Sequence, residues 1–112
     1  MKYISFVVPC FNSEKYMEKC IDSLLMCGDD VEIIIVNDGS TDTTAEIAKN
    51  YLKNNSNIKF IDKENGGHGS GINAGLKICE GLYFKCVDSD DWIDFDAYKK
   101  LIKAIKDNYN KN

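Results

Sequence analysis

The chain of 112 residues is 44% hydrophobic and 29% charged, which predicts a single compact domain over residues 1–112 and excludes a disordered or linker-rich protein. Its 14 basic residues, all of them lysine, and 18 acidic residues give a net charge of −4. Because it has neither arginine nor a basic stripe, the chain is not expected to have nucleic acid as a partner.

Five cysteines, an odd number without a CxxC pair, argue against both a zinc site and a closed disulfide framework. A reducing cytosol is therefore the expected location. The apolar segment before Pro9 is too short for a signal peptide, and no stretch approaches the length of a transmembrane span. We expect a cytoplasmic protein whose contact with the inner face of a membrane, if it makes one, is peripheral.

Eight segments alternate between strand and helix patterns. The strand segments are short, β-branched or aromatic and bounded by turn residues, whereas the helix segments carry apolar residues at i, i+3, i+4 and i+7. Ser40, Thr41 or Asp42 can cap the second and weakest helix. The expected elements are strand 3–8, helix 17–25, strand 31–36, helix 43–54, strand 58–61, helix 72–79, strand 82–87 and helix 98–109.

This alternation predicts an α/β fold with an open, doubly wound and mainly parallel sheet covered by helices on both faces. Ligands of such sheets bind beyond the carboxyl ends of the strands. The residues that follow the four strands are 9–12, 37–42, 62–67 and 88–91. Acidic and small polar residues therefore gather at one rim of the sheet.

The segment "VDSDDWID", residues 87–94, contains four carboxylates directly after a predicted strand. A turn or helix cap needs one carboxylate, and this is the simplest interpretation of Asp42, Asp62 and Asp94 taken singly. Further carboxylates in "DSDD" repel one another by roughly 1 kcal/mol per close exposed pair. A hard divalent cation such as Mg²⁺ or Mn²⁺, bound together with phosphate oxygens, would relieve this repulsion.

Four sequence blocks, in this order and spacing, resemble the inverting glycosyltransferases of family 2. They are "ISFVVPCFN", "IIIVNDGSTDTT", "NGGHGSGINAGL" and "GLYFKCVDSDDW". The resemblance implies a GT-A fold with a Rossmann-like nucleotide-binding half. It also implies a nucleotide-sugar donor, most often a UDP-sugar, held through Mn²⁺ or Mg²⁺ on a D-x-D motif. The expected reaction transfers the sugar to a saccharide or lipid-linked acceptor, as in cell-surface polysaccharide biosynthesis.

The first two blocks resemble the family's uracil site. Pro9 and Phe11 match its first part, where the aromatic ring packs on the base, although Phe11 could equally cover the sheet edge. Asp38 matches the aspartate that accepts a hydrogen bond from the uracil imide, a role that suits an ionised carboxylate. The alternative for Asp38 is a cap on the turn that follows it.

The third block departs from the family pattern, because Ile72 stands where many members have an arginine near the diphosphate. Free amides of residues 66–70, including Gly67, could compensate at a helix N-terminus. His68 could reach a phosphate or a sugar hydroxyl, and a solvated loop histidine is the alternative.

In the fourth block, Asp88 and Asp90 match the metal-binding D-x-D pair. The resemblance makes Asp90 the direct metal ligand and places Asp88 nearer the ribose or an outer-sphere water. Ser89 lies between them and is expected to touch the nucleotide. Trp92 is expected to pack under this loop.

The family's catalytic base is an aspartate in the acceptor-binding half, which follows the D-x-D strand and its helix. We therefore expect the truncated N-terminal, donor-binding half of a longer glycosyltransferase, without a catalytic residue and inactive alone. A non-catalytic nucleotide-sugar-binding or interaction module is the first alternative. A Rossmann-type dinucleotide-binding protein is the second, because residues 69–74 fit G-x-G-x-x-A, although they follow the third strand instead of the first.

Without an acceptor-binding half to cover part of the sheet, the chain is expected to expose apolar surface and to form a dimer or a larger species. Light scattering across a concentration series measures the mass of the particle in solution. A monomer mass at every concentration would contradict this expectation.

Overall fold

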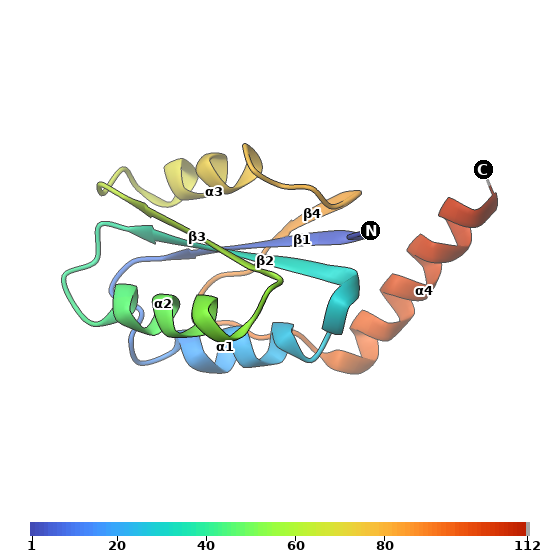
Figure 1. Ribbon diagram of the computed structural model, residues 1–112, viewed down its shortest axis with the longest axis horizontal. Helices are drawn as coiled ribbons and strands as arrows, with labels where there is room; N and C mark the ends of the chain where they lie inside the picture. The colour runs from blue at the N-terminus through green and yellow to red at the C-terminus, as the bar shows by residue number, and fades with distance from the viewer. Residues whose placement is uncertain (112) are drawn as a thin grey trace.

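The computed structural model describes residues 1–111 (Figure 1). Each strand and helix expected from the sequence is present; α1 has the expected bounds, and each of the others differs at one or both ends. The elements are β1 (Ile4–Cys10), α1 (Met17–Leu25), a 3-10 turn (Gly28–Asp30), β2 (Val31–Asp38), α2 (Thr44–Asn54), β3 (Ile58–Lys63), α3 (His68–Leu76), β4 (Tyr83–Cys86) and α4 (Phe95–Lys111).

Helix α3 shows the largest shift of a starting residue. It begins at His68 instead of residue 72, because the glycines of its first turn carry no apolar stripe that a sequence pattern could detect. Carboxylates cap two other helices. Asp42 accepts a hydrogen bond from the Thr44 amide at the start of α2, so among Ser40, Thr41 and Asp42 the cap is Asp42. Asp94 accepts two amide hydrogen bonds at the start of α4.

The four strands form one parallel sheet in the order β3-β2-β1-β4. The two central strands, β1 and β2, are buried along their whole length. Ile4 pairs with Val31 on one side of β1 and with Tyr83 on the other, so the carboxyl ends of the central strands reach the same rim. The predicted α/β fold with an open parallel sheet is confirmed.

Alternate side chains of the central strands fill two separate hydrophobic layers. Phe6 and Ile33 belong to the larger layer, which also takes in residues of α1, α2 and α4. Val7 and Ile34 belong to the smaller layer, which lies under α3. Figure 1 shows α3 on one side of the sheet and α1 and α2 on the other, as the prediction of helices on both faces requires.

Glycines bring α3 close to the sheet. A Cβ atom at Gly75 would lie 2.5 Å from Cγ1 of Val7, and one at Gly71 would lie 3.3 Å from Cβ of Pro9. These glycines belong to the "GSGINAG" segment, which is inside the helix and not in a turn before it. The dinucleotide-binding interpretation therefore does not fit, because its glycines must form the turn after the first strand.

A buried carboxylate joins β1, β2 and β3 under the start of β4. Glu32 accepts hydrogen bonds from the Ser5 hydroxyl and the Glu80 amide, and it pairs with Lys59 at 2.9 Å. Burial disfavours its charged form, but these three hydrogen bonds outweigh burial and lower the pKa of Glu32.

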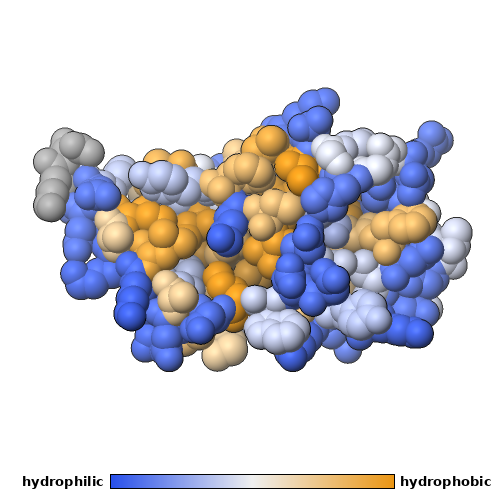
Figure 2. Space-filling model, turned by 180° about the vertical axis from the view of Figure 1, so that it is seen from behind, coloured by the Kyte–Doolittle hydropathy of each residue, from blue (hydrophilic) through white to orange (hydrophobic). Residues whose placement is uncertain are grey.

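Strand β4 forms an edge of the sheet, and Tyr83 and Phe84 within it and Leu82 just before it are exposed. Seen from behind, the molecule shows hydrophobic areas between hydrophilic residues (Figure 2). Within residues 1–111, none of the helices combines the length and the hydrophobicity needed to cross a bilayer.

Gly75→Ala is expected to destabilise the fold by about 1–2 kcal/mol. The added methyl group collides with Val7, which costs about 1–3 kcal/mol, while the better helix propensity of alanine returns less than about 1 kcal/mol. Urea unfolding measures the difference. Gly69→Ala is the matched control, because nothing lies within 4 Å of its Cβ position. A Gly75→Ala protein as stable as the wild type would contradict the close packing of α3.

Glu32→Gln is expected to lower the free energy of unfolding at neutral pH by about 3 kcal/mol, since Lys59 loses its buried partner. Because the folded state lowers the pKa of Glu32, the stabilisation is complete above its unfolded value of 4.5 and is lost as the pH falls below it. The wild-type and variant stabilities should therefore converge in acid. Glu64→Gln, at an exposed loop position, is the control for loss of one surface charge.

Candidate functional site

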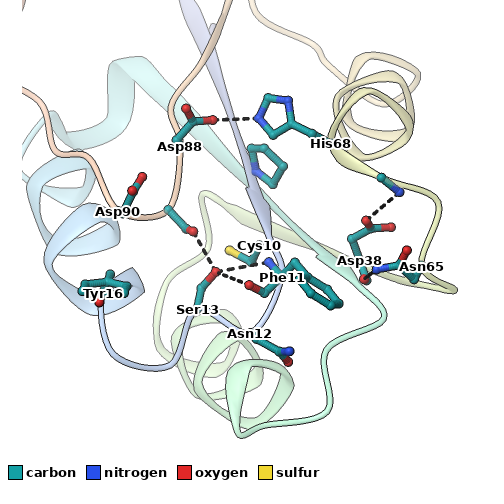
Figure 3. Close-up of a pocket in the computed structure, with 13 residues that line it drawn as sticks. Cys10, Phe11, Asn12, Ser13, Tyr16, Asp38, Asn65, His68, Asp88 and Asp90 are labelled. Atoms are coloured by element: carbon teal, nitrogen blue, oxygen red, sulfur yellow. Dashed lines mark hydrogen bonds and ion pairs between the residues drawn. The ribbon is translucent and has the colours of Figure 1, made fainter.

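A pocket of about 470 Å³ opens beyond the carboxyl ends of β1, β2 and β4 (Figure 3). From β1 the chain passes to β2 on one side, and β4 later returns to the other side, so the pocket lies where the strand order reverses. Open parallel sheets bind their ligands at this point. The pocket is lined by Pro9, Cys10, Phe11, Asn12, Ser13, Tyr16, Asp38, Asn65, Gly67, His68, Asp88, Ser89 and Asp90.

The structure brings all the site residues named from the sequence into this one pocket, although their individual roles remain predictions. Sequence reasoning did not assign Ser13 or Tyr16, and it named Cys10, Asn12 and Asn65 only as part of the rim. Tyr16 directly precedes α1. Its spacing in the sequence does not show whether the ring packs on the helix or faces the pocket. Asn65 Nδ2 donates to the Asp38 carbonyl oxygen at the end of β2 at 3.1 Å, a contact that its place in the rim does not reveal.

Asp38 is buried at the end of β2, with 4% of its surface exposed. Its Oδ1 accepts from Lys63 Nζ at 2.9 Å and from the Gly66 amide at 2.8 Å, and its Oδ2 accepts from the Gly67 amide at 2.9 Å. The hydrogen bond from Lys63, with those from the two amides, lowers the pKa of Asp38 and keeps it ionised.

A carboxylate offers about four lone-pair sites, and the three hydrogen bonds of Asp38 leave one of them on Oδ2, in a residue that lines the pocket. The adjacent turn is capped by Asn37, whose Oδ1 accepts from the Ser40 amide at 3.2 Å. The alternative of Asp38 as the cap of that turn therefore does not hold, because Asp38 binds the loop before α3 instead.

The expectation of free amides at residues 66–70 is wrong for the first two. The Gly66 and Gly67 amides donate to Asp38, and Gly67 adopts a φ of 92°, which a side chain would disfavour. The amides of His68, Gly69 and Ser70 form the first turn of α3, where the helix itself provides no acceptors. These three are the helix-end donors that can face an anion.

The "DSDD" segment forms a turn in which the Asp91 amide donates to the Asp88 carbonyl oxygen at 2.9 Å. Carboxylate oxygens of Asp88, Asp90 and Asp91 nevertheless lie within 4.8 Å of one another, and all three residues are exposed. A donor set made only of carboxylate oxygens, with room for water or phosphate, suits Mg²⁺ or Mn²⁺. The residues therefore fit the predicted metal, with Asp91 as an additional candidate ligand.

The loop after β1 is fixed by hydrogen bonds from two neighbouring loops. Ser13 Oγ lies 2.7 Å from Ser89 Oγ and accepts from the Phe11 amide at 3.1 Å. Asn12 has a φ of 47°, and its Oδ1 accepts from the Thr41 amide at 2.8 Å. The side chain of Phe11 is 53% exposed and borders the pocket, which agrees with an aromatic wall more than with a cover on the sheet edge.

His68 and Asp88 close the opposite wall of the pocket. His68 Nε2 lies 2.7 Å from Asp88 Oδ1, which links the start of α3 to the segment after β4 (Figure 3). His68 is therefore not an isolated solvated side chain. Cys10 at the base of the pocket is buried, and burial raises the pKa of its thiol to about 12, so it stays protonated and is not a nucleophile.

One further expectation changes in the structure. Trp92 does not pack under the loop; it is 57% exposed, and Lys19 Nζ lies 3.4 Å from the centre of its ring. At the position of the arginine found in many family members, Ile72 is half-buried in α3. The cation nearest to Asp38 is Lys63, which comes from the end of β3 and is already paired with that carboxylate.

Over residues 5–111 the chain matches the family model described as Glycosyl transferase family 2. It is 41% identical to the uncharacterized glycosyltransferase EpsJ of Bacillus subtilis (strain 168), over 94% of the chain and 31% of EpsJ. It is 37% identical to the chondroitin synthase of Pasteurella multocida (strain Pm70), over 91% of the chain and 11% of the synthase.

The crystal structure of S. aureus TarS 1-349 in complex with UDP aligns with a TM-score of 0.84 and 35% identity, over 96% of this chain and 32% of the chain in that structure. The chain thus spans a third or less of the length of these relatives. The predicted GT-A fold agrees with this alignment. The match over nearly the whole chain, together with the fold, shows that this chain belongs to glycosyltransferase family 2.

Proposed function

We propose that the chain is the donor-binding part of a glycosyltransferase that transfers a sugar from a UDP-sugar to an acceptor hydroxyl with the help of a divalent metal. The observation that carries this proposal is the pocket itself, where an aromatic wall, a buried carboxylate acceptor and a cluster of carboxylates lie together. The TarS structure, which is 35% identical and was solved with UDP, supports uridine as the nucleoside.

The nucleoside would bind at the β1 and β2 side of the pocket. Phe11 and Tyr16, both more than half exposed, offer apolar faces for a planar base. Asp38 has one remaining lone pair for an imide N–H, and its other hydrogen bonds hold it in place. A base with an acceptor instead of a donor at this position would face the ionised carboxylate and be rejected.

The diphosphate would bind at the β4 side, where the pocket is most acidic. Asp90 and Asp88, with Asp91 beside them, would hold Mn²⁺ or Mg²⁺, and this metal would supply the positive charge that stabilises the departing nucleoside diphosphate. Ser89, fixed by Ser13, positions the turn that carries both carboxylates. The first amides of α3 would add hydrogen bonds to the phosphate oxygens.

Transfer with inversion also needs a general base that deprotonates the acceptor hydroxyl. We assign this role to none of residues 1–111. Asp38 is held ionised by three hydrogen bonds, and its remaining lone pair is proposed to face the base, while Asp88, Asp90 and Asp91 are proposed to hold the metal. The proposal is therefore that this chain binds the donor but does not turn it over alone, and that a saccharide or lipid-linked acceptor is bound by residues outside it.

UDP titrated by calorimetry is expected to bind in the presence of Mn²⁺ and not in EDTA. Asp90→Ala should weaken binding by at least ~10–100-fold, because losing a metal ligand costs no less than losing one of its outer-sphere partners. Asp96→Ala is the matched control, since this exposed aspartate lies on α4 away from the pocket.

Equal UDP affinity with and without metal would overturn the role of the carboxylates while leaving the nucleoside site intact. UDP binding that fails in all conditions, with a folded protein by circular dichroism, would overturn the proposal that this chain contains a complete donor pocket.

A further inference from the structure

A second group of metal-binding side chains lies beside the carboxylate cluster and differs from it chemically. His68 Nε2, Cys86 Sγ and a carboxylate oxygen of Asp88 lie within 4.8 Å of one another. His68 is the first residue of α3, Cys86 is the last residue of β4, and Asp88 follows two positions later. The sequence argued against zinc because its cysteines are odd in number and form no CxxC pair. It did not reveal this group, whose members come from separate elements.

The strand register supports this convergence independently. Cys86 pairs with Val7 of β1, and Val7 belongs to the hydrophobic layer under α3. Because paired residues of neighbouring strands point to the same face, Cys86 also points toward α3. Asp88, two residues further, reaches the same side and is held 2.7 Å from His68 Nε2.

The three donors are a thiolate, an imidazole and a carboxylate. Zn²⁺ binds these three ligand types, usually in tetrahedral geometry, and three protein ligands leave one position open. Mg²⁺ and Mn²⁺ prefer oxygen ligands, as offered by Asp88, Asp90 and Asp91. The two groups share Asp88, so a soft cation and a hard cation would compete for this carboxylate.

We propose that His68, Cys86 and Asp88 form a binding site for Zn²⁺ or a similar soft cation, and that its occupation antagonises donor binding. The antagonism rests on the proposed function, because it requires the donor's metal to use Asp88. The site itself does not rest on it. A zinc ion at this site would remove Asp88 from the carboxylate cluster.

Co²⁺ is a suitable probe, because it takes the tetrahedral geometry of Zn²⁺ and is displaced by Zn²⁺, which binds more tightly. Titration of the reduced 112-residue protein with Co²⁺ is expected to give a thiolate-to-cobalt charge-transfer absorption with one equivalent bound. Added Zn²⁺ should abolish this absorption. No charge-transfer absorption in the wild-type protein would overturn the site.

Cys86→Val should remove the absorption, and His68→Gln should weaken cobalt binding by at least ~10-fold. Cys79→Val is the matched control, since Cys79 is also a free and half-buried cysteine but hydrogen-bonds to Gly75 within its own segment. An absorption that persists in Cys86→Val or disappears in Cys79→Val would assign the thiolate to another cysteine and overturn the proposal.

Calorimetry then tests the antagonism. Zn²⁺ is expected to weaken binding of UDP with Mn²⁺ on the order of tenfold in the wild-type protein and to have no such effect in Cys86→Val. Equal inhibition in both proteins would overturn the antagonism. A cobalt signal in a protein that does not bind UDP with Mn²⁺ would overturn the proposed function and support the metal site, so the two failures are distinguishable.

Discussion

The parallel pairing of β1 with both β2 and β4 determines where the functional groups of this chain lie. Three strands that run in the same direction end at the same rim, so Phe11, Asp38 and Asp88 meet although they are far apart in the sequence. The packing of α3 onto Val7 completes the pocket on the side of β4, because it places His68 beside Asp88. A sheet with β4 reversed would leave the pocket without its carboxylate cluster.

Charge within the pocket is distributed unevenly, and this asymmetry has a physical cause. At the β2 end, Lys63 balances the negative charge of Asp38, and two amides donate hydrogen bonds to it. Asp38 is therefore a fixed acceptor. At the β4 end, the three aspartates of the "DSDD" turn have only His68 as a basic neighbour among the contacts described for residues 1–111. A dianionic ligand could approach this end only together with a cation.

The sequence was sufficient for the fold, because strand and helix periodicities differ and their alternation permits few topologies. It was also sufficient to bring the candidate residues to one pocket, since the carboxyl ends of parallel strands meet at one rim. It was not sufficient for partners that depend on side-chain packing. The capture of Asp38 by residues 66 and 67, the exposure of Trp92 against Lys19 and the approach of Cys86 to His68 all follow from how α3 and the loops pack.

The sharing of Asp88 between two donor sets also explains how one rim can discriminate between cations. Asp90 and Asp91 add oxygen donors on one side of Asp88, whereas His68 and Cys86 add nitrogen and sulfur on the other. The first set favours a hard ion that also binds water or a diphosphate. The second set favours a soft ion. A cation bound by Asp88 would deprive the other set of a ligand, so under the two proposals the identity of the metal and the occupation of the donor pocket would be coupled.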